Sequence, residues 1–253
     1  MSRIVIHICV LVAFFVFLYG RSSASDQKPG TQIAAKLEGT IETDGAKTDF
    51  EVRYLQFLPE SYKADGKPLP VILFRHGAGE RGDNIDLVKK WGPPRIVEKK
   101  KEFPFIVISP QCPKNRGWEA AKLLPLVEHT LKTLNTDPDR VYVTGLSMGG
   151  YGTWEIIAAS PHRFAAGMPL CGRGDVAKAK DLVGTPIHAV IGGKDRKTTN
   201  DSVREIVKAV KAAGGKHIDY TLHEDLGHNV WSRTYSSPET WKWFLSHKRG
   251  AKD

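Results

Sequence analysis

Six short runs of apolar residues after residue 70 place the strongest constraint on how this chain folds. The runs are Val71–Phe74, Phe105–Ile108, Val141–Val143, Ala166–Leu170, Ile187–Ile191 and Ile218–Leu222. Short continuous runs of this kind are typical of strands buried on both faces. Longer segments with helical spacing separate several of them, and a helical crossover makes the strands that it joins parallel. The sequence therefore predicts an α/β fold with a mainly parallel, doubly wound sheet.

The segment before these runs has a different spacing of apolar residues. Residues 31 to 58 alternate in polarity in two stretches, separated by Thr43-Asp44-Gly45, which predicts an antiparallel hairpin that opens the sheet. Apolar residues recur at helical spacing in residues 123–134 and 203–210. These two segments are predicted to be helices that turn one face to the core.

Residues 1–24 are interpreted as a secretory signal peptide. Arg3 precedes an apolar run from Ile4 to Tyr19, and Ser22-Ser23-Ala24 supplies small residues suited to cleavage. The alternative is an uncleaved membrane anchor, because the run is just short of the ~20 residues that span a bilayer. Residues 25–30 are expected to be disordered, and residues 31–253 to form a single domain. The protein is therefore expected to be secreted or periplasmic, or membrane-anchored if the leader is not cleaved.

Charge and cysteine content limit the possible partners. The net charge is +9, of which Arg3 and Arg21 in the leader supply two. The remaining cations are scattered, which favours a solvated surface over a nucleic-acid groove. Cys112 and Cys171 follow predicted strands; export would permit a disulfide, whereas burial in such places is typical of free thiols. No metal-ligand spacing is present, so neither a metal nor a cofactor is expected.

The candidate nucleophile follows the predicted strand at Val141–Val143. The chain there reads Gly145-Leu146-Ser147-Met148-Gly149-Gly150, directly before a helical segment. A G-x-S-x-G sequence by itself is a weak signal. Between a strand and a helix it is the nucleophile elbow of the α/β-hydrolase fold, in which flanking glycines allow the tight turn. Ser147 is therefore the predicted nucleophile.

A serine hydroxyl needs a base, and His228 is the predicted one. In this fold the nucleophile, the acid and the histidine follow in that order, the last two after later strands. His228 lies in Leu226-Gly227-His228-Asn229, after the last predicted strand. His223 is the closest rival, but it continues that strand directly. The other histidines occupy positions that do not fit, namely His76, His129, His162, His188, His217 and His247.

Asp195 is the predicted acid, because it ends Ile191-Gly192-Gly193-Lys194-Asp195 after the intervening strand. Asp201 is expected to cap a helix instead. The oxyanion that develops during acyl transfer needs hydrogen-bond donors. The backbone N–H of Met148 is predicted to supply one and that of Ala78, in the glycine-rich loop after the first parallel strand, the other; Gly77 and Gly79 are alternatives to Ala78.

Three blocks of sequence, residues 74–84, 109–112 and 137–150, resemble the phospholipase/carboxylesterase-like branch of the α/β-hydrolases. Within it they are similar to secreted "predicted peptidase" and feruloyl or acetyl esterase-like members. The resemblance covers about residues 50–248. It implies a carboxylic ester hydrolase that works without a cofactor. It does not decide the substrate, because the branch contains both esterases and peptidases.

The expected substrate is a small-molecule or carbohydrate-linked ester. Trp118 and Trp231 are predicted to reach the face of the site and to contact the substrate, with Gln111 at its border. A tryptophan that only packs in the core is the alternative. A serine peptidase would use the same three residues, and a catalytically dead binding protein would usually have lost one of them. The oligomeric state is not determined by the sequence.

Overall fold

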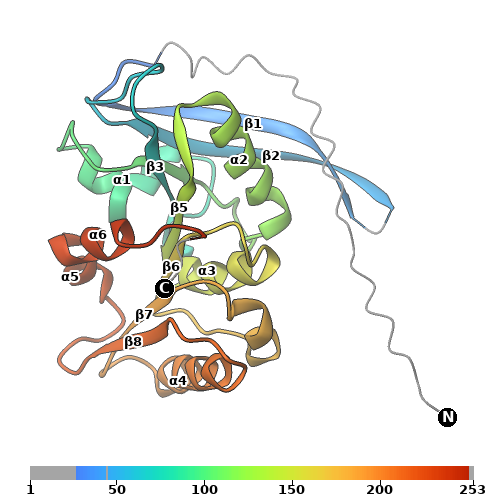
Figure 1. The fold of residues 1–253 in the computed structure, drawn as a ribbon, viewed down its shortest axis with the longest axis vertical. Helices are drawn as coiled ribbons and strands as arrows, with labels where there is room; N and C mark the ends of the chain where they lie inside the picture. The colour runs from blue at the N-terminus through green and yellow to red at the C-terminus, as the bar shows by residue number, and fades with distance from the viewer. Residues whose placement is uncertain (1–26, 44, 251–253) are drawn as a thin grey trace.

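An eight-stranded sheet runs through the molecule in the order β1-β2-β4-β3-β5-β6-β7-β8 (Figure 1). The computed structural model describes residues 27–43 and 45–250. β1 and β2 pair with each other in antiparallel register, β2 pairs antiparallel with β4, and the other neighbours are parallel. The strands are β1 (Thr31–Thr43), β2 (Ala46–Leu58), β3 (Leu69–Arg75), β4 (Ile106–Pro110), β5 (Thr136–Leu146), β6 (Ala166–Leu170), β7 (Ile187–Gly192) and β8 (Ile218–His223). The predicted α/β class, the hairpin and the mainly parallel sheet are confirmed.

Helices cover both faces of this sheet and create two apolar cores. Side chains of α2, α3 and α4 pack in one core, and those of α1, α5 and α6 pack in the other. The helices are α1 (Gly92–Val97), α2 (Ala120–Thr133), α3 (Met148–Ala159), α4 (Lys197–Ala212), α5 (Trp231–Ser236) and α6 (Pro238–Leu245). Short 3₁₀ segments cover η2 (Ala78–Glu80), η3 (Ile85–Lys90) and η4 (Val176–Leu182). In the described ranges no helix has the length and apolar character to cross a bilayer.

Two local expectations are wrong, and a third is not tested. The predicted leader, residues 1–24, lies outside the described residues. Residues 27–30 were expected to be disordered, but Gln27 is buried and donates from Nε2 to the carbonyl of Gln56 at 3.0 Å, while Gly30 N–H donates to Leu58 O at 2.8 Å. Asp201 does not cap a helix, because α4 begins four residues earlier, and its carboxylate pairs with Lys197 and Arg204 along that helix.

The turn from β5 into α3 is packed directly against the end of β3. Ser147 N–H donates to Leu170 O of β6 at 2.8 Å. A Cβ atom on Gly149 would overlap the backbone carbonyl of Arg75, and one on Gly145 would overlap the backbone of Gly149. Glycine is therefore required at both positions, because the backbones approach too closely for any side chain.

We expect Gly149→Ala to lower the free energy of unfolding by about 1–3 kcal/mol, since the added methyl group must push the turn away from β3. Gly117→Ala is the matched control, because its Cβ atom would meet nothing within 4 Å. Urea unfolding of the two variants and the wild type measures this difference. Equal stability of the two variants would show that the turn is less tightly packed than the structure indicates.

Candidate functional site

Ser147 occupies the sharp turn between β5 and α3. Its backbone has φ 52° and ψ −115°, a left-handed conformation that is rare for a residue with a side chain. Such strained backbone is found mainly at functional sites, where the surrounding structure holds it in place. Hydrogen bonds fix this turn on both sides: Ser147 N–H donates to Leu170 O, and Ser147 O accepts from Tyr151 N–H at 3.1 Å.

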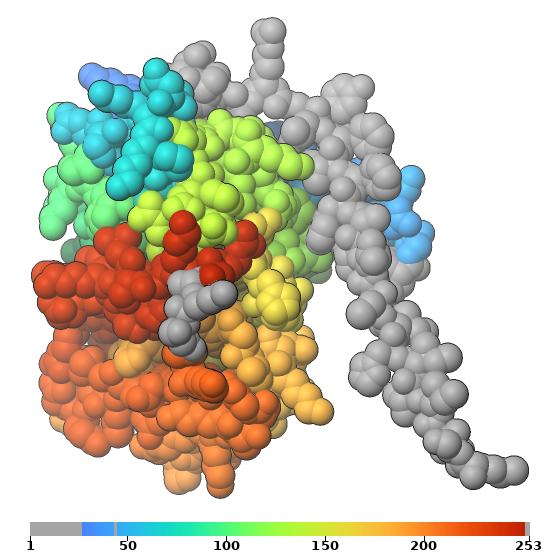
Figure 2. Space-filling view, viewed as in Figure 1, coloured from blue at the N-terminus to red at the C-terminus, as the bar shows by residue number. Residues whose placement is uncertain are grey.

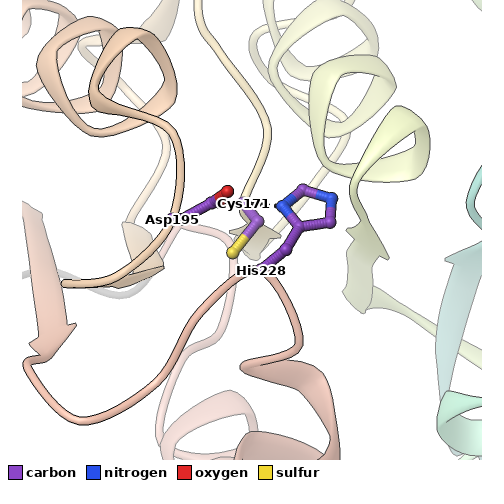
Figure 3. Close-up of side chains that lie close together, drawn as sticks. All are labelled: Cys171, Asp195 and His228. Carbon is purple, nitrogen blue, oxygen red and sulfur yellow. Dashed lines mark hydrogen bonds and ion pairs between the residues drawn. The ribbon is translucent and has the colours of Figure 1, made fainter.

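Three predicted site residues lie in one chain of hydrogen bonds. His228 Nε2 is 2.9 Å from Ser147 Oγ, and His228 Nδ1 is 2.8 Å from Asp195 Oδ2. The Asp195 side chain is 3% exposed, whereas that of His228 is 39% exposed. The carboxylate can only accept, so Nδ1 carries the proton and Nε2 is left to accept from the serine hydroxyl. Figure 3 shows Asp195 and His228 directed toward each other.

Two neighbouring loops hold the acid and the histidine together. Asp195 follows β7, and His228 follows β8, its parallel neighbour. The loops are joined by a backbone hydrogen bond from Lys194 N–H to Leu226 O at 2.8 Å. Asp195 Oδ1 also accepts from the N–H of Arg196 at 2.7 Å, which orients the carboxylate. The positions of the two side chains are thus set by the sheet and not by the two residues alone.

The loop after β3 lies beside the nucleophile turn. A Cβ atom on Gly77 would be 2.9 Å from Cδ1 of Leu146, the residue before Ser147. Ala78, the predicted second oxyanion donor, comes next and begins η2. Met148 is the first residue of α3, and the first N–H groups of a helix have no partner inside it. The arrangement therefore brings both predicted donor segments to the elbow, and their role as an oxyanion hole stays a prediction.

His76 fixes this loop, a role that is not predicted from the sequence. Its buried ring donates from Nδ1 to Gly77 O at 2.6 Å and accepts at Nε2 from Cys112 N–H at 3.0 Å. Burial lowers the pKa of His76 to about 4, so the ring is neutral near pH 7 and a single tautomer satisfies both bonds. The bond to Gly77 O orients the peptide group whose N–H belongs to Ala78. No local sequence signal would have found this role, because it depends on the contact with Cys112, which is distant in sequence.

Trp118 and Gln111 do not occupy the positions expected of substrate-binding residues. Trp118 is buried, donates from Nε1 to His76 O at 3.2 Å and packs edge-on against the His76 ring. Gln111 is buried as well and donates from Nε2 to Glu80 O at 3.1 Å and to Asn84 O at 2.7 Å. Both side chains support the loop after β3, because they donate hydrogen bonds to backbone carbonyls in this part of the chain. The predicted contact with substrate is corrected to a supporting role.

Trp231 lies next to His228, and its contact with substrate stays a prediction. Its ring stands perpendicular to that of His228, with centroids 5.4 Å apart. On its other side it meets Trp91 edge-on, with centroids 6.0 Å apart. Trp231 is therefore the one predicted substrate-binding residue that is both half-buried and in contact with His228.

Cys171 lies next to Asp195 and His228 (Figure 3), with the potential ligand atoms of the three within 4.8 Å of one another. Cys112 and Cys171 are both free and buried, which answers the question of their pairing. Burial, together with the nearby Asp195 carboxylate, raises the pKa of the Cys171 thiol to about 12. A metal ligand must be a thiolate, and His228 Nδ1 is already bonded to Asp195. We therefore assign no metal to this cluster.

The buried His76 predicts a particular loss of stability in acid. Because its folded pKa of about 4 lies below the unfolded value of 6.5, the unfolded chain binds the extra proton first. The stability that this group contributes is present above pH 6.5 and declines as the pH falls toward 4, by up to about 3 kcal/mol. We expect His76→Gln to lack this contribution, so that urea unfolding from pH 7 to pH 4 gives a shallower decline than in the wild type. Parallel curves would contradict the buried neutral state.

Comparisons with known proteins agree with this fold. Residues 111–240, just over half of the chain, match the Dienelactone hydrolase family. A solved thermostable esterase shares 30% identity with a TM-score of 0.68; the match covers 85% of this chain and 63% of the esterase. Two further solved structures share the fold. The Pyrococcus horikoshii acylaminoacyl peptidase has 16% identity and a TM-score of 0.62, and the match covers 88% of this chain and 43% of the peptidase. The acetyl xylan esterase from Aspergillus awamori has 16% identity and a TM-score of 0.61, and the match covers 77% of this chain and 94% of that esterase.

The chain spans less than two thirds of the length of the thermostable esterase and less than half of the peptidase. No curated protein sequence gives a significant match. The matched region contains the nucleophile turn, Asp195 and His228, so the family match and the site geometry refer to the same part of the molecule. This chain belongs to the dienelactone hydrolase family.

Proposed function

We propose that this protein is an exported serine hydrolase that cleaves carboxylic esters of small molecules or carbohydrates. The observation that carries the proposal is the continuous hydrogen-bonded chain from Ser147 Oγ through His228 to Asp195, with distances of 2.9 and 2.8 Å. Its order along the sequence and its positions after β5, β7 and β8 match the arrangement of α/β-hydrolase triads. The 30% identity with an esterase favours esters over the amides that peptidases cleave.

The proposed reaction proceeds through an acyl-enzyme. Ser147 Oγ attacks the acyl carbonyl carbon while His228 Nε2 takes the hydroxyl proton. The Asp195 carboxylate stabilises the imidazolium without accepting its proton. The N–H groups of Met148 and Ala78 stabilise the oxyanion. Loss of one such donor lowers kcat by about 10²–10³-fold. His228 then protonates the leaving alcohol, and water attacks the acyl-enzyme by the same steps in reverse.

We expect Ser147→Ala to lower kcat/KM for a short-chain chromogenic ester by at least about 10³-fold, because no other described hydroxyl is hydrogen-bonded to His228 Nε2. Ser246→Ala is the matched control, because it removes an exposed hydroxyl at the C-terminal end of α6. This variant is expected to keep full activity. A fluorophosphonate probe should label the wild type and the control, and not Ser147→Ala. Equal inactivity of all three proteins toward both reagents would favour a binding protein on this scaffold.

The same assay separates esterase from peptidase. A panel of a feruloyl ester, an acetylated sugar and a peptide amide ranks the substrates of the wild type. We expect turnover of the esters and little of the amide, since an alcohol leaves more readily than an amine and the chain shares 30% identity with an esterase. Faster cleavage of the amide than of the esters would replace the proposal by a serine peptidase.

Export is part of the proposal and rests on the leader sequence alone. We expect the protein isolated from outside the cytoplasm of its source, or from the periplasm of an expression host, to lack residues 1–24. Intact-protein mass measurement checks this directly. Recovery of the full-length chain in a membrane fraction would support the anchored alternative.

A further inference from the structure

A groove of about 820 Å³ lies between α1 and the pair α5 and α6, beside the proposed catalytic centre. In Figure 1 these helices lie on the left, with α1 above α5 and α6. Figure 2 shows the outer surface of α5 and α6 in red on the same side. The volume falls in the range of about 300–1,000 Å³ that small-molecule sites occupy. No step of the mechanism above uses this groove.

Trp231 connects the groove to the reacting atoms. It lines the groove, and its ring also contacts the ring of His228. His228 must reach the leaving oxygen to protonate it, so the alcohol half of an ester lies on the histidine's side of Ser147. A substrate bound at Ser147 therefore directs its alcohol half past His228, toward Trp231 and the groove beyond it.

The walls of the groove combine aromatic and apolar side chains. Trp91, Trp231 and Trp241 line it together with Ile96 and Phe103. Trp241 is stacked on Tyr235, with an interplanar angle of 12°, so its ring is held rigidly. Rigid aromatic walls bind flat or ring-shaped groups with little loss of side-chain entropy.

The charged groups of the groove are mainly cationic. Arg95, Lys99 and Lys100 line it, and the acidic member is Glu102. Glu102 is already engaged, because its carboxylate accepts from the N–H of Ser61 at 2.9 Å and from the Ser61 hydroxyl at 2.8 Å. Lys99 and Lys100 are exposed and form no ion pair with any residue in the ranges that the structure describes. These hydrogen bonds leave the charge of Glu102 in place, so the groove has three cations against one carboxylate, a net positive charge beside an apolar wall.

We propose that this groove binds the alcohol half of the substrate, and that this half is a ring-bearing group with a carboxylate. The inference rests on the proposed ester hydrolysis and narrows it to a substrate class. Trp231 and Trp91 contact the ring, while Arg95, Lys99 and Lys100 attract the carboxylate. Carboxylated sugars and hydroxylated aromatic acids share this chemistry, and the substrates below distinguish them.

The test compares pairs of esters of which only one member carries a carboxylate. 4-Acetoxybenzoate and 4-acetoxybenzamide have the same ring and the same acetyl ester, but only the first is anionic. Acetylated oligosaccharides of equal length, one neutral and one made of uronic acids, form the second pair. We expect the anionic member of at least one pair to have the higher kcat/KM, by about tenfold, because the three exposed cations attract its carboxylate. The pair that shows the preference identifies the source of the ring.

A charge variant with a matched control tests the assignment to this groove. Arg95→Gln/Lys99→Gln/Lys100→Gln removes its cations, whereas Lys47→Gln/Lys180→Gln/Lys208→Gln removes three exposed lysines that do not line it. We expect the first variant to lose the preference for the anionic ester and the control to keep it. The control variant should also leave hydrolysis of phenyl acetate unchanged, because Lys47, Lys180 and Lys208 lie outside both the reacting centre and the groove.

The outcomes separate this inference from the function on which it rests. Equal rates for the charged and neutral member of both pairs would overturn the groove assignment while phenyl acetate turnover still supports the esterase. An equal loss of preference in both charge variants would also overturn it, because net charge and not the groove would then attract the substrate. Absence of ester turnover and of fluorophosphonate labelling in the wild type would remove the proposed function itself.

Discussion

The close contact between the end of β3 and the turn that holds Ser147 is the constraint on which the rest of the site depends. Gly145 and Gly149 allow the two backbones to meet, with the carbonyl of Arg75 lying where a side chain would otherwise be. This contact places the loop after β3 next to the nucleophile and leaves Ser147 at φ 52°. The strain is retained because β3, β5 and β6 are all held in the central sheet, where a local relaxation of the turn would disrupt their packing.

Rigid support behind the loop comes from buried polar groups. His76 is bonded at both ring nitrogens, and Trp118 and Gln111 donate to backbone carbonyls in and around the loop. Each of these side chains is buried, so each bond forms where water cannot replace it. A donor peptide held in this way needs little reorganisation when charge develops on a bound substrate, which is the property that electrostatic stabilisation requires.

The two faces of the sheet contribute differently to the proposed activity. The core under α2, α3 and α4 carries the helix that follows Ser147, whereas α1, α5 and α6 on the other face enclose the groove next to Trp231. Chemistry and substrate selection would then depend on separate groups of elements. Changes in α1 or α5 could alter the substrate without disturbing the hydrogen bonds of Ser147, His228 and Asp195, in keeping with the range of activities that one hydrolase fold supports.

The sequence by itself determined the strands, the hairpin and the order Ser147, Asp195 and His228, because apolar runs and the glycine-flanked serine are local signals. The positions of Asp195 and His228 followed from that order, since the ends of parallel strands meet at one edge. Only the tertiary structure decided that Trp118 and Gln111 are buried supports, that His76 holds the loop and that α1 and α5 form a cationic groove. These features depend on contacts between segments distant in sequence. No local pattern determines which face of a tryptophan or histidine ring becomes buried.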